Sequence, residues 1–172
     1  MQKAEQAITI RALSAADHDA VAALNRAAFG GEDEVGIIDR LRRDDLVAVE
    51  LVAVQAGAIL GHILLSVLPT TMDGRPVRAL ALAPVAVLPG QQRKGIGGRL
   101  IEAALEEGRR LGFEAVIVLG HPVYYPRFGF SAVLARRLAS PFQGEAFMAL
   151  ELVPGALAGQ AGAVTYPSAF GI

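Results

Sequence analysis

Two short stretches of this sequence carry side chains whose types and spacing could support chemistry. The first is QQRKGIGG, residues 91–98, which combines two cations with three glycines where a helix is expected to begin. Backbone N–H groups at a helix N-terminus lack internal partners and carry the positive end of the helix dipole. Because glycine lets a bulky anion approach such groups closely, this stretch predicts a cradle for a phosphate group.

Two known phosphate-binding patterns fit this stretch only in part. Gly90 and Gly95 have the spacing of a P-loop, Gly-x-x-x-x-Gly-Lys-[Ser/Thr], but Ile96 stands in place of the lysine. A dinucleotide-binding fingerprint, Gly-x-Gly-x-x-Gly, could begin at Gly95, but Leu100 occupies its third glycine position. Both patterns are therefore disfavoured, and a glycine-rich turn without a ligand is the remaining alternative to a phosphate cradle.

The same stretch resembles a coenzyme-binding loop. Residues 92–97, QRKGIG, match the [Gln/Arg]-x-x-Gly-x-[Gly/Ala] signature of the GNAT superfamily of acetyltransferases, whose loop wraps the pyrophosphate of coenzyme A. The preceding LAPVAVLP, residues 82–89, resembles the fourth strand of that family. The resemblance implies acetyl-CoA or coenzyme A as the bound group, and no metal. The residues that it implies for coenzyme binding here are Val85, Ala86, Val87, Gln92, Arg93, Lys94, Gly95, Ile96, Gly97, Gly98 and Arg99.

The second stretch is GHPVYYPRFGF, residues 120–130, which resembles the closing signature of the same family. In that signature a tyrosine lies four residues before the glycine of a Gly-Phe pair, which makes it Tyr125 here. The family's tyrosine lies near the coenzyme sulfur and protonates the departing thiolate, and a positioned acid typically accelerates such a step by about 10²–10⁴-fold. The alternatives are that Tyr125 is an amphipathic core aromatic, or that neighbouring Tyr124 is the acid.

The histidines allow more than one interpretation. Many relatives carry an asparagine after the fifth strand that contacts the pantetheine arm, whereas this chain has Gly120, His121 and Pro122. His121 could contact the coenzyme or carry a proton, or it could hold a turn through backbone hydrogen bonds. His18 and His62 are expected to be structural or solvated.

A general base is not evident in the sequence. Attack on a thioester requires a neutral amine, so a carboxylate or a water chain must accept a proton. In GNAT folds the first two helices and their linker line the acceptor cleft, and the matching segment here is FGGEDE, residues 29–34. Glu32 and Glu34 are therefore candidates for the base or for acceptor contacts. The alternative is a solvated helix start whose acids favour the helix dipole.

The elements that must position these residues follow from hydrophobic periodicity. Ile96, Leu100, Ile101 and Ala104 share one face of the helix that follows the glycine loop. Because this helix links two buried strands, those strands are expected to be parallel. Strands are predicted at 7–11, 46–54, 58–68, 77–87, 114–119 and 145–153, and helices from Ser14 to Phe29, over 31–43 and over 94–111.

Composition limits the class of protein. A length of 172 residues favours one domain over 1–172, and a net charge of −1 argues against a nucleic-acid partner. The absence of cysteine excludes disulfides and thiolate chemistry. The N-terminus lacks the apolar core of a signal peptide, so a cytoplasmic location is expected. The apolar segment 51–72 could span a bilayer by length, but its glycines and β-branched residues favour two strands joined near Gly57.

The uncharged tail, residues 152–172, is expected to pack on the domain or on a partner subunit of a monomer or homodimer. The resemblance implies an α+β fold, also describable as three α/β layers. Its mixed, mostly antiparallel sheet would have about seven strands, splayed between the fourth and fifth, with helices on both faces. It also implies an N-acetyltransferase that moves the acetyl group of acetyl-CoA to an amine of a small molecule or peptide. The alternatives are a non-catalytic acyl-CoA sensor, or an enzyme with a longer acyl donor accommodated by Ala81, Ala83 and Ala86.

Overall fold

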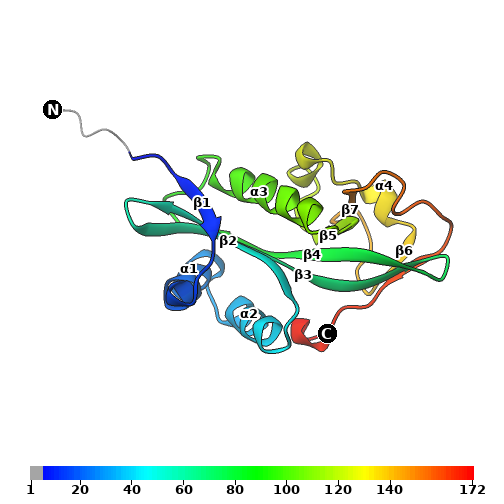
Figure 1. The fold of residues 1–172 in the computed structure, drawn as a ribbon, viewed down its shortest axis with the longest axis horizontal. Coiled ribbons are helices and arrows are strands. Elements are labelled where there is room, and N and C mark those ends of the chain that lie inside the picture. Colours follow the sequence, from blue (N-terminus) through cyan, green and yellow to red (C-terminus); the bar gives the residue numbers. More distant parts are fainter. Residues whose placement is uncertain (1–5) are drawn as a thin grey trace.

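A computed structural model describes residues 6–172. A central sheet carries helices α1 and α2 on one face and α3 on the other (Figure 1). The strands are β1 (Thr9–Ala12), β2 (Val47–Gln55), β3 (Ala58–Met72), β4 (Arg75–Val87), β5 (Ala115–Leu119), β6 (Leu138–Ala139), β7 (Phe147–Glu151) and β8 (Gly162–Val164). The helices are α1 (His18–Phe29), α2 (Asp33–Arg43), α3 (Ile96–Arg110) and α4 (Ala132–Ala135), with 3₁₀ turns η1 (Ala15–Asp17), η2 (Tyr125–Phe128) and η3 (Ser168–Phe170).

The sheet is mixed and mostly antiparallel, as predicted. Its main path runs β1-β2-β3-β4-β5-β7, and β8 pairs with both β3 and β6. Strands β4 and β5 are parallel, but they pair only from Ala79 with Ala115 to Ala81 with Ile117. Strand β4 then continues to Val87 without β5 beside it. The predicted splay between the fourth and fifth strands is therefore confirmed.

An irregularity in β4 marks the point where the two strands part. Ile63 of β3 pairs with Val85, whereas Leu65 pairs with Leu82, so β4 holds one extra residue in this interval. Such a bulge bends its strand and interrupts the hydrogen-bond ladder. Pro84 lies in the bulge, where its missing N–H removes no regular ladder bond. The bulge and the splay together open the sheet between the ends of β4 and β5.

The core on the α3 side explains how this helix is held against the sheet. Leu100, Ile101 and Ala104 are fully buried. A Cβ atom on Gly61 of β3 would lie 2.8 Å from Cδ1 of Leu100, so only glycine permits this approach. The apolar face predicted for the helix therefore packs against β3, and the start of α3 is fixed relative to the end of β4.

The long apolar segment predicted as a hairpin forms β2 and β3, with the turn at Ala56 and Gly57. No helix within residues 6–172 is long and apolar enough to cross a membrane. The helix predicted from Ser14 begins instead with the 3₁₀ turn η1, and α1 follows at His18. The backbone N–H of Ser14 donates to the Asp17 carboxylate over 2.8 Å at this start.

The C-terminal segment packs on the same domain. Val164 of β8 pairs with Thr70 of β3, and Leu157 is fully buried. The Arg40 guanidinium of α2 donates to the carbonyl of Ala169 over 2.9 Å, which places η3 beside α2 (Figure 1). The sequence predicted about seven strands, and the sheet formed within residues 6–172 has eight, of which the short β6 and β8 leave no periodic signal.

Candidate functional site

The glycine-rich loop between β4 and α3 presents a run of unpaired backbone donors. Among the described residues, no N–H group from Gln92 to Gly98 donates to a protein acceptor, and Arg99 is the first that does, to the carbonyl of Gly95 over 3.1 Å. Arg93 and Gly95 adopt positive φ angles of 64° and 81°. Successive free N–H groups at a helix start form an anion-binding concavity. The predicted phosphate cradle therefore has the donors that it requires.

A cavity of about 870 Å³ lies over this loop. Its charged side chains are the guanidinium groups of Arg93, Arg99 and Arg127 and a single carboxylate, that of Glu102. The excess of cations favours a polyanion, and the volume suits a ligand much larger than a phosphate ion. Its other lining residues are Val87, Gln91, Gln92, Gly95, Ile96, Gly97, Gly98, His121, Tyr124 and Phe128. We call this cavity the donor cavity.

A small residue is needed at Gly97 and Gly98, at the start of α3, to keep the donor cavity open. A Cβ atom on Gly97 would lie 3.5 Å from the Tyr124 hydroxyl, and one on Gly98 would lie 3.6 Å from Cζ of Phe128. A methyl group would fit at ordinary contact distance, but a larger side chain would occupy the cavity. The cradle and the cavity together offer backbone donors, cations and space to a ligand that carries phosphate groups.

Some residues expected to bind the coenzyme have other contacts. The Gln92 amide donates to the carbonyl of Val87 over 3.2 Å, and Lys94 contacts the side chain of Gln91 rather than lining the cavity. Arg99 lines the cavity and also donates to the carbonyl of Ile8 over 3.0 Å. Ala86 is buried opposite His62 of β3. Contacts of these four residues with a coenzyme stay predictions.

A second cavity of about 290 Å³ lies where β4 and β5 part. It shares no lining residue with the donor cavity, but adjacent Tyr124 and Tyr125 line one cavity each. Its lining residues come from α1, α2, β4, β5 and η2: Phe29, Glu34, Ile37, Leu82, Ala83, Pro84, Val85, Leu119 and Tyr125. We call it the acceptor cavity, and the two tyrosines mark the place where the cavities approach each other.

Tyr125 has an available hydroxyl group on a fixed ring. The side chain is buried among aromatic neighbours, with ring centroids 5.2 Å from Tyr124 and 5.7 Å from Phe130. Burial raises the pKa of Tyr125 to about 12, so the phenol keeps its proton at neutral pH. Within the described part of the chain, its hydroxyl makes no hydrogen bond. Tyr125 can therefore donate a proton, and it is unsuited to act as a base.

The turn before Tyr125 is held by the backbone of His121. The His121 carbonyl accepts hydrogen bonds from the N–H groups of Tyr124 and Tyr125, over 3.1 and 3.3 Å. The turn-holding role considered for this residue is thus present through its backbone. His121 also lines the donor cavity. Its position is therefore compatible both with a role at the coenzyme and with the turn-holding role.

The two candidate glutamates are in different environments. Glu34 lines the acceptor cavity in the first turn of α2, and its carboxylate has no hydrogen bond or ion pair with any residue from 6 to 172. Glu32 lies outside that cavity, and its carboxylate pairs with Arg26 over 2.6 Å. The structure therefore brings Glu34, but not Glu32, to the same cavity as Tyr125.

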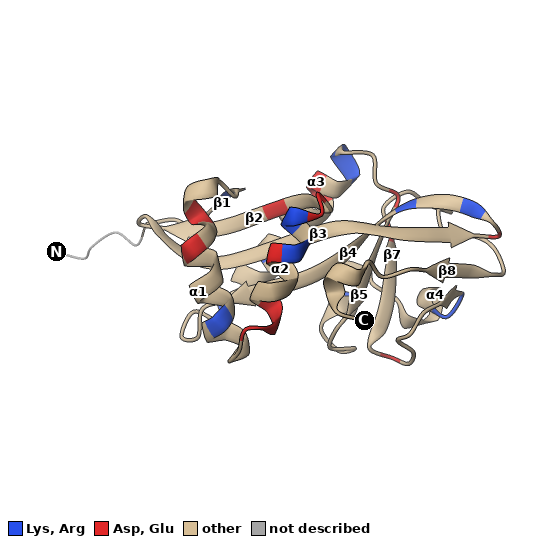
Figure 2. Ribbon diagram, turned by 90° about the horizontal axis from the view of Figure 1, so that it is seen from below, with Lys and Arg blue, Asp and Glu red and all other residues tan. Residues whose placement is uncertain are grey.

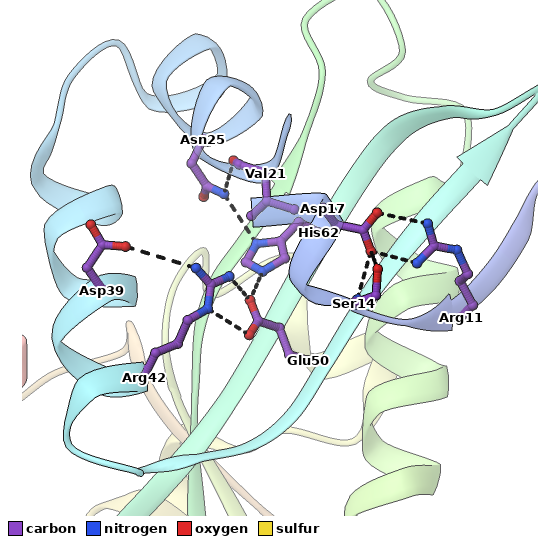
Figure 3. A network of polar contacts seen from close by, with 9 residues as sticks. All are labelled: Arg11, Ser14, Asp17, Val21, Asn25, Asp39, Arg42, Glu50 and His62. Atoms are coloured by element: carbon purple, nitrogen blue, oxygen red, sulfur yellow. Dashed lines mark hydrogen bonds and ion pairs between the residues drawn. The ribbon is translucent and has the colours of Figure 1, made fainter. Parts of the chain in front are cut away.

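A buried polar network joins α1 and α2 to the sheet (Figure 3). The Asn25 amide nitrogen donates to the carbonyl of Val21 over 2.9 Å and lies 3.2 Å from Nδ1 of His62. Nδ1 must then accept, so the ring proton is on Nε2, which donates to Glu50 over 2.6 Å. Arg42 of α2 also binds Glu50, over 2.6 Å. The network ties α1 and α2 to the sheet.

The network bears on the histidine predictions and on the charge of Glu50. Burial alone would raise the pKa of Glu50, but hydrogen bonds from His62 and Arg42 outweigh it and hold the pKa below its usual value. His62 is fully buried and His18 is exposed on α1, and neither residue lines a cavity. These placements agree with the structural and solvated roles expected for the two histidines.

Several lining residues were not found from the sequence. Arg127 lies within the 120–130 stretch, and its guanidinium carbon lies 4.6 Å from the Tyr124 ring centroid beside the donor cavity. The positive charge of Arg127 within this stretch was a signal in the sequence that could have pointed to the binding of an anion. Ile37, Leu82 and Leu119 gave no such signal, because apolar residues in a helix or strand are normally assigned to the core.

Comparison with known proteins identifies the class to which this fold and these cavities belong. The family model "Acetyltransferase (GNAT) domain" matches residues 9–133. The N-acetyltransferase YhbS of Escherichia coli (strain K12) is 30% identical over 90% of this chain and 93% of its own length. YjhQ of the same organism is 41% identical over 60% of this chain, and the match spans only 58% of YjhQ.

Solved structures agree with this match. The crystal structure of YhbS from E. coli in complex with CoA has a TM-score of 0.88 and 28% identity, and the alignment covers 100% of this chain and 96% of that one. A GNAT family acetyltransferase from Brucella melitensis in complex with acetyl-CoA has a TM-score of 0.79 and 32% identity, over 96% of this chain and 99% of that one. The chain belongs to the GNAT family of acetyltransferases, and acyl transfer is its general activity.

Proposed function

We propose that this protein transfers the acetyl group of acetyl-CoA directly to an acceptor amine. The observation that carries the proposal is the pair of cavities lined by adjacent tyrosines. One cavity has free backbone donors and an excess of guanidinium groups, and the other has a single carboxylate. The crystal structures of related proteins with CoA or acetyl-CoA support the choice of donor.

In this proposal the donor cavity holds acetyl-CoA, which supplies an acetyl group activated as a thioester. The N–H groups of residues 93–98 and the guanidinium groups of Arg93, Arg99 and Arg127 bind the pyrophosphate. Strand β4 from Val85 to Val87 has no β5 partner, so its backbone is available to align the pantetheine arm as an added strand would be aligned. Ala86 would take part through this backbone, since its side chain is buried.

Tyr125 and Glu34 have separate tasks in the proposed reaction. The Tyr125 hydroxyl gives its proton to the departing thiolate, and the raised pKa of the phenol keeps that proton in place until the bond between carbon and sulfur breaks. Glu34, which lines the same cavity, binds the acceptor amine and accepts the proton that the amine must lose. Fixing both reactants in adjoining cavities supplies much of the rate through orientation.

The remaining parts of the proposal concern donor length, acceptor and location. Ala81 and Ala86 are buried in the core and only Ala83 lines a cavity, so acetyl is favoured over a long acyl chain.

The acceptor is an amine of a small molecule or peptide, and the cytoplasm, where acetyl-CoA is available, is the proposed location. The oligomeric state in this proposal is a monomer or a homodimer.

Coenzyme binding and acetyl transfer test the proposal at two levels. Acetyl-CoA at 100 times its dissociation constant should stabilise the fold by about 2.7 kcal/mol, a shift of roughly 5–11 °C. A long-chain acyl-CoA should compete poorly. Thiol release with a broad amine panel should reveal an acetylated product by mass spectrometry, and Tyr125→Phe should lower kcat by about 10²-fold or more.

The neighbouring tyrosine provides a matched comparison. Tyr124→Phe removes the same hydroxyl from the donor cavity, where the proposal gives it no proton to transfer. It should therefore affect kcat much less than Tyr125→Phe. Absence of any effect of coenzyme A compounds on thermal stability would overturn the donor assignment, and equal kcat losses in the two variants would overturn the role of Tyr125.

A further inference from the structure

We infer that the acceptor amine of this enzyme is carried on a compact apolar body, such as an arylalkyl or branched alkyl group. The inference rests on the proposed function and specifies the substrate class of the acceptor cavity. It excludes polyhydroxylated amines and linear polyamines as preferred acceptors. Three features of the cavity carry it: its lining, its rim and its single unpaired carboxylate.

The acceptor cavity has an apolar lining. Apart from Glu34 and the Tyr125 hydroxyl, its side chains are hydrocarbon: Phe29, Ile37, Leu82, Ala83, Pro84, Val85 and Leu119. A hydroxyl group of an acceptor would lose water in this cavity and find few side-chain partners, which costs free energy. A second ammonium group would find no second carboxylate. An apolar group has no hydrogen bonds with water to lose when it enters the cavity, and its transfer out of water is favourable.

The rim of the cavity exposes two large apolar side chains. Phe29 at the end of α1 is 44% exposed, and Leu119 at the end of β5 is 48% exposed. The two residues come from different elements, and both line the same cavity. An apolar acceptor body would cover them when it enters the cavity. The rim therefore favours an acceptor whose hydrocarbon part extends to the mouth of the cavity.

Glu34 accounts for the amine end of the ligand. Its carboxylate is half-buried in the first turn of α2 and has no partner among residues 6–172, although basic side chains lie on the same helix. The helix begins with three consecutive acids, Glu32, Asp33 and Glu34, which form an acidic stretch at its start (Figure 2). Of these three carboxylates only that of Glu34 belongs to a residue lining the acceptor cavity. One charge matches an acceptor with one ammonium group.

The size of the cavity sets the size of the acceptor. About 290 Å³ lies near the lower end of the range for small-molecule sites, which is roughly 300–1,000 Å³. A single aromatic ring with a short aminoalkyl chain fits such a volume, whereas an oligosaccharide does not. A peptide could enter only with an apolar terminal residue. The acceptor class is thus limited in polarity, charge and size by one cavity.

The experiment compares amines at saturating acetyl-CoA, with thiol release as the readout and product mass as confirmation. Phenethylamine and isoamylamine represent the inferred class, while glucosamine and spermidine represent polar and polycationic amines. We expect kcat/KM for the apolar amines to be higher by about tenfold or more, the effect of one unfavourable polar burial. The reverse order would overturn the inference and leave the proposed function intact.

Variants separate the contributions of charge and lining. Glu34→Gln should lower kcat/KM for phenethylamine by about tenfold or more, because it removes the carboxylate that binds the amine and accepts its proton. Asp39→Asn is the matched control: it removes the same charge from the same helix, but its carboxylate is 70% exposed and lines no part of the cavity. Equal effects of the two variants would overturn the inference.

A third variant and a binding measurement complete the design. Leu119→Thr, at an exposed strand end, should lower kcat/KM for phenethylamine while leaving the dissociation constant of acetyl-CoA unchanged. An unchanged kcat/KM would contradict the role of the rim. If acetyl-CoA binds but no amine of either set is acetylated, the inference fails while coenzyme binding by the donor cavity stands. Failure of acetyl-CoA to bind would overturn the proposed function at its first step.

Discussion

Gly120 and Tyr125 are in a contact that only glycine permits. A Cβ atom on Gly120 would lie 2.3 Å from Cε2 and 2.8 Å from Cδ2 of the Tyr125 ring, far inside van der Waals contact. Gly120 directly follows β5, and Tyr125 begins η2. The phenol ring is thereby seated against the backbone at the end of the strand, which fixes its hydroxyl relative to the splay between β4 and β5.

The first prediction concerns this contact. Gly120→Ala should displace the Tyr125 ring and lower kcat to a similar degree as Tyr125→Phe. Overpacking of this kind also costs roughly 1–3 kcal/mol of unfolding free energy. Thiol-release kinetics and thermal unfolding measure the two effects. Because the backbone of Gly120 is not at positive φ, the loss would report crowding rather than backbone strain.

Gly31→Ala is the stability control for that substitution. Gly31 also has an ordinary φ, and a Cβ atom there would meet nothing within 4 Å. The unfolding free energy of the Gly31→Ala variant should change by less than about 0.5 kcal/mol, as is usual for surface positions, and its melting temperature should change correspondingly little. A Gly120→Ala protein with unchanged turnover and stability would show that the ring can move without consequence.

The contact also illustrates what the sequence could and could not predict. The spacing of Tyr125 from Gly129 identified the tyrosine, but no spacing shows that Gly120 lies against its ring. Strong periodicity predicted the β2–β3 hairpin and α3 within a few residues, since each segment contains a full repeat of its pattern. Strands β6 and β8, of two and three residues, contain no repeat and were missed.

Polar contacts between distant residues were equally invisible in the sequence. Asn25 and His62 are 37 positions apart, and each occurs in an apolar segment that by itself predicts a core helix or strand. Their pairing depends on α1 crossing β3, which is a tertiary relationship. The acceptor cavity depends in the same way on the direction of β4 after its bulge, so its apolar lining followed only from the fold.

The second prediction concerns Arg127 and coenzyme binding. Its guanidinium stacks on Tyr124 beside the donor cavity, and its Nε donates to the Tyr124 carbonyl over 3.1 Å. Arg127→Met keeps the length of the side chain but removes its charge. The dissociation constant of coenzyme A should rise about tenfold, equivalent to roughly 1.4 kcal/mol, and its dependence on salt should weaken. Calorimetric titration at two ionic strengths measures both.

Arg136→Met is the control for the loss of one positive charge. Arg136 is exposed and lines neither cavity, so its replacement should leave the dissociation constant unchanged. If both arginine variants weakened binding equally, only the net charge of the protein would matter. The local role of Arg127 would then be wrong.

The third prediction concerns pH and the Glu50 network. Because the folded-state pKa of Glu50 is lowered, the unfolded chain takes up its proton first on acidification. The stabilising effect of this carboxylate is therefore present at neutral pH and declines as the pH falls through the usual glutamate range, near 4.5. Glu50→Gln should cost roughly 3 kcal/mol at neutral pH and make the unfolding free energy less dependent on pH below about 5.

Urea unfolding over a series of pH values tests that expectation, with Glu106→Gln for comparison. Glu106 pairs with Arg109 on the surface of α3, and its side chain is 77% exposed. An exposed pair of this kind contributes about 0.2–1 kcal/mol, so the control should remain close to the unmodified protein. A Glu50→Gln profile parallel to the unmodified profile would show that the network does not hold the lowered pKa.

The fourth prediction concerns the C-terminal segment. Leu157 is fully buried, its N–H donates to Glu151 over 2.8 Å, and its carbonyl accepts from Arg137 over 3.3 Å. Leu157→Ala should therefore cost about 3 kcal/mol through a cavity in the core, or roughly 6–12 °C in melting temperature. Val153→Ala, at a position that is 46% exposed, should change stability by no more than about 0.5 kcal/mol.

Measuring the Leu157 variant at two protein concentrations decides which surface the tail covers. If residues 152–172 complete the core of their own chain, the loss in stability is the same at both concentrations, because folding is then unimolecular. If the tail instead stabilised a partner subunit, the melting temperatures would depend on concentration through mass action. The pairing of β8 with β3 in the same chain, from Thr70 with Val164 to Met72 with Gly162, favours the first outcome.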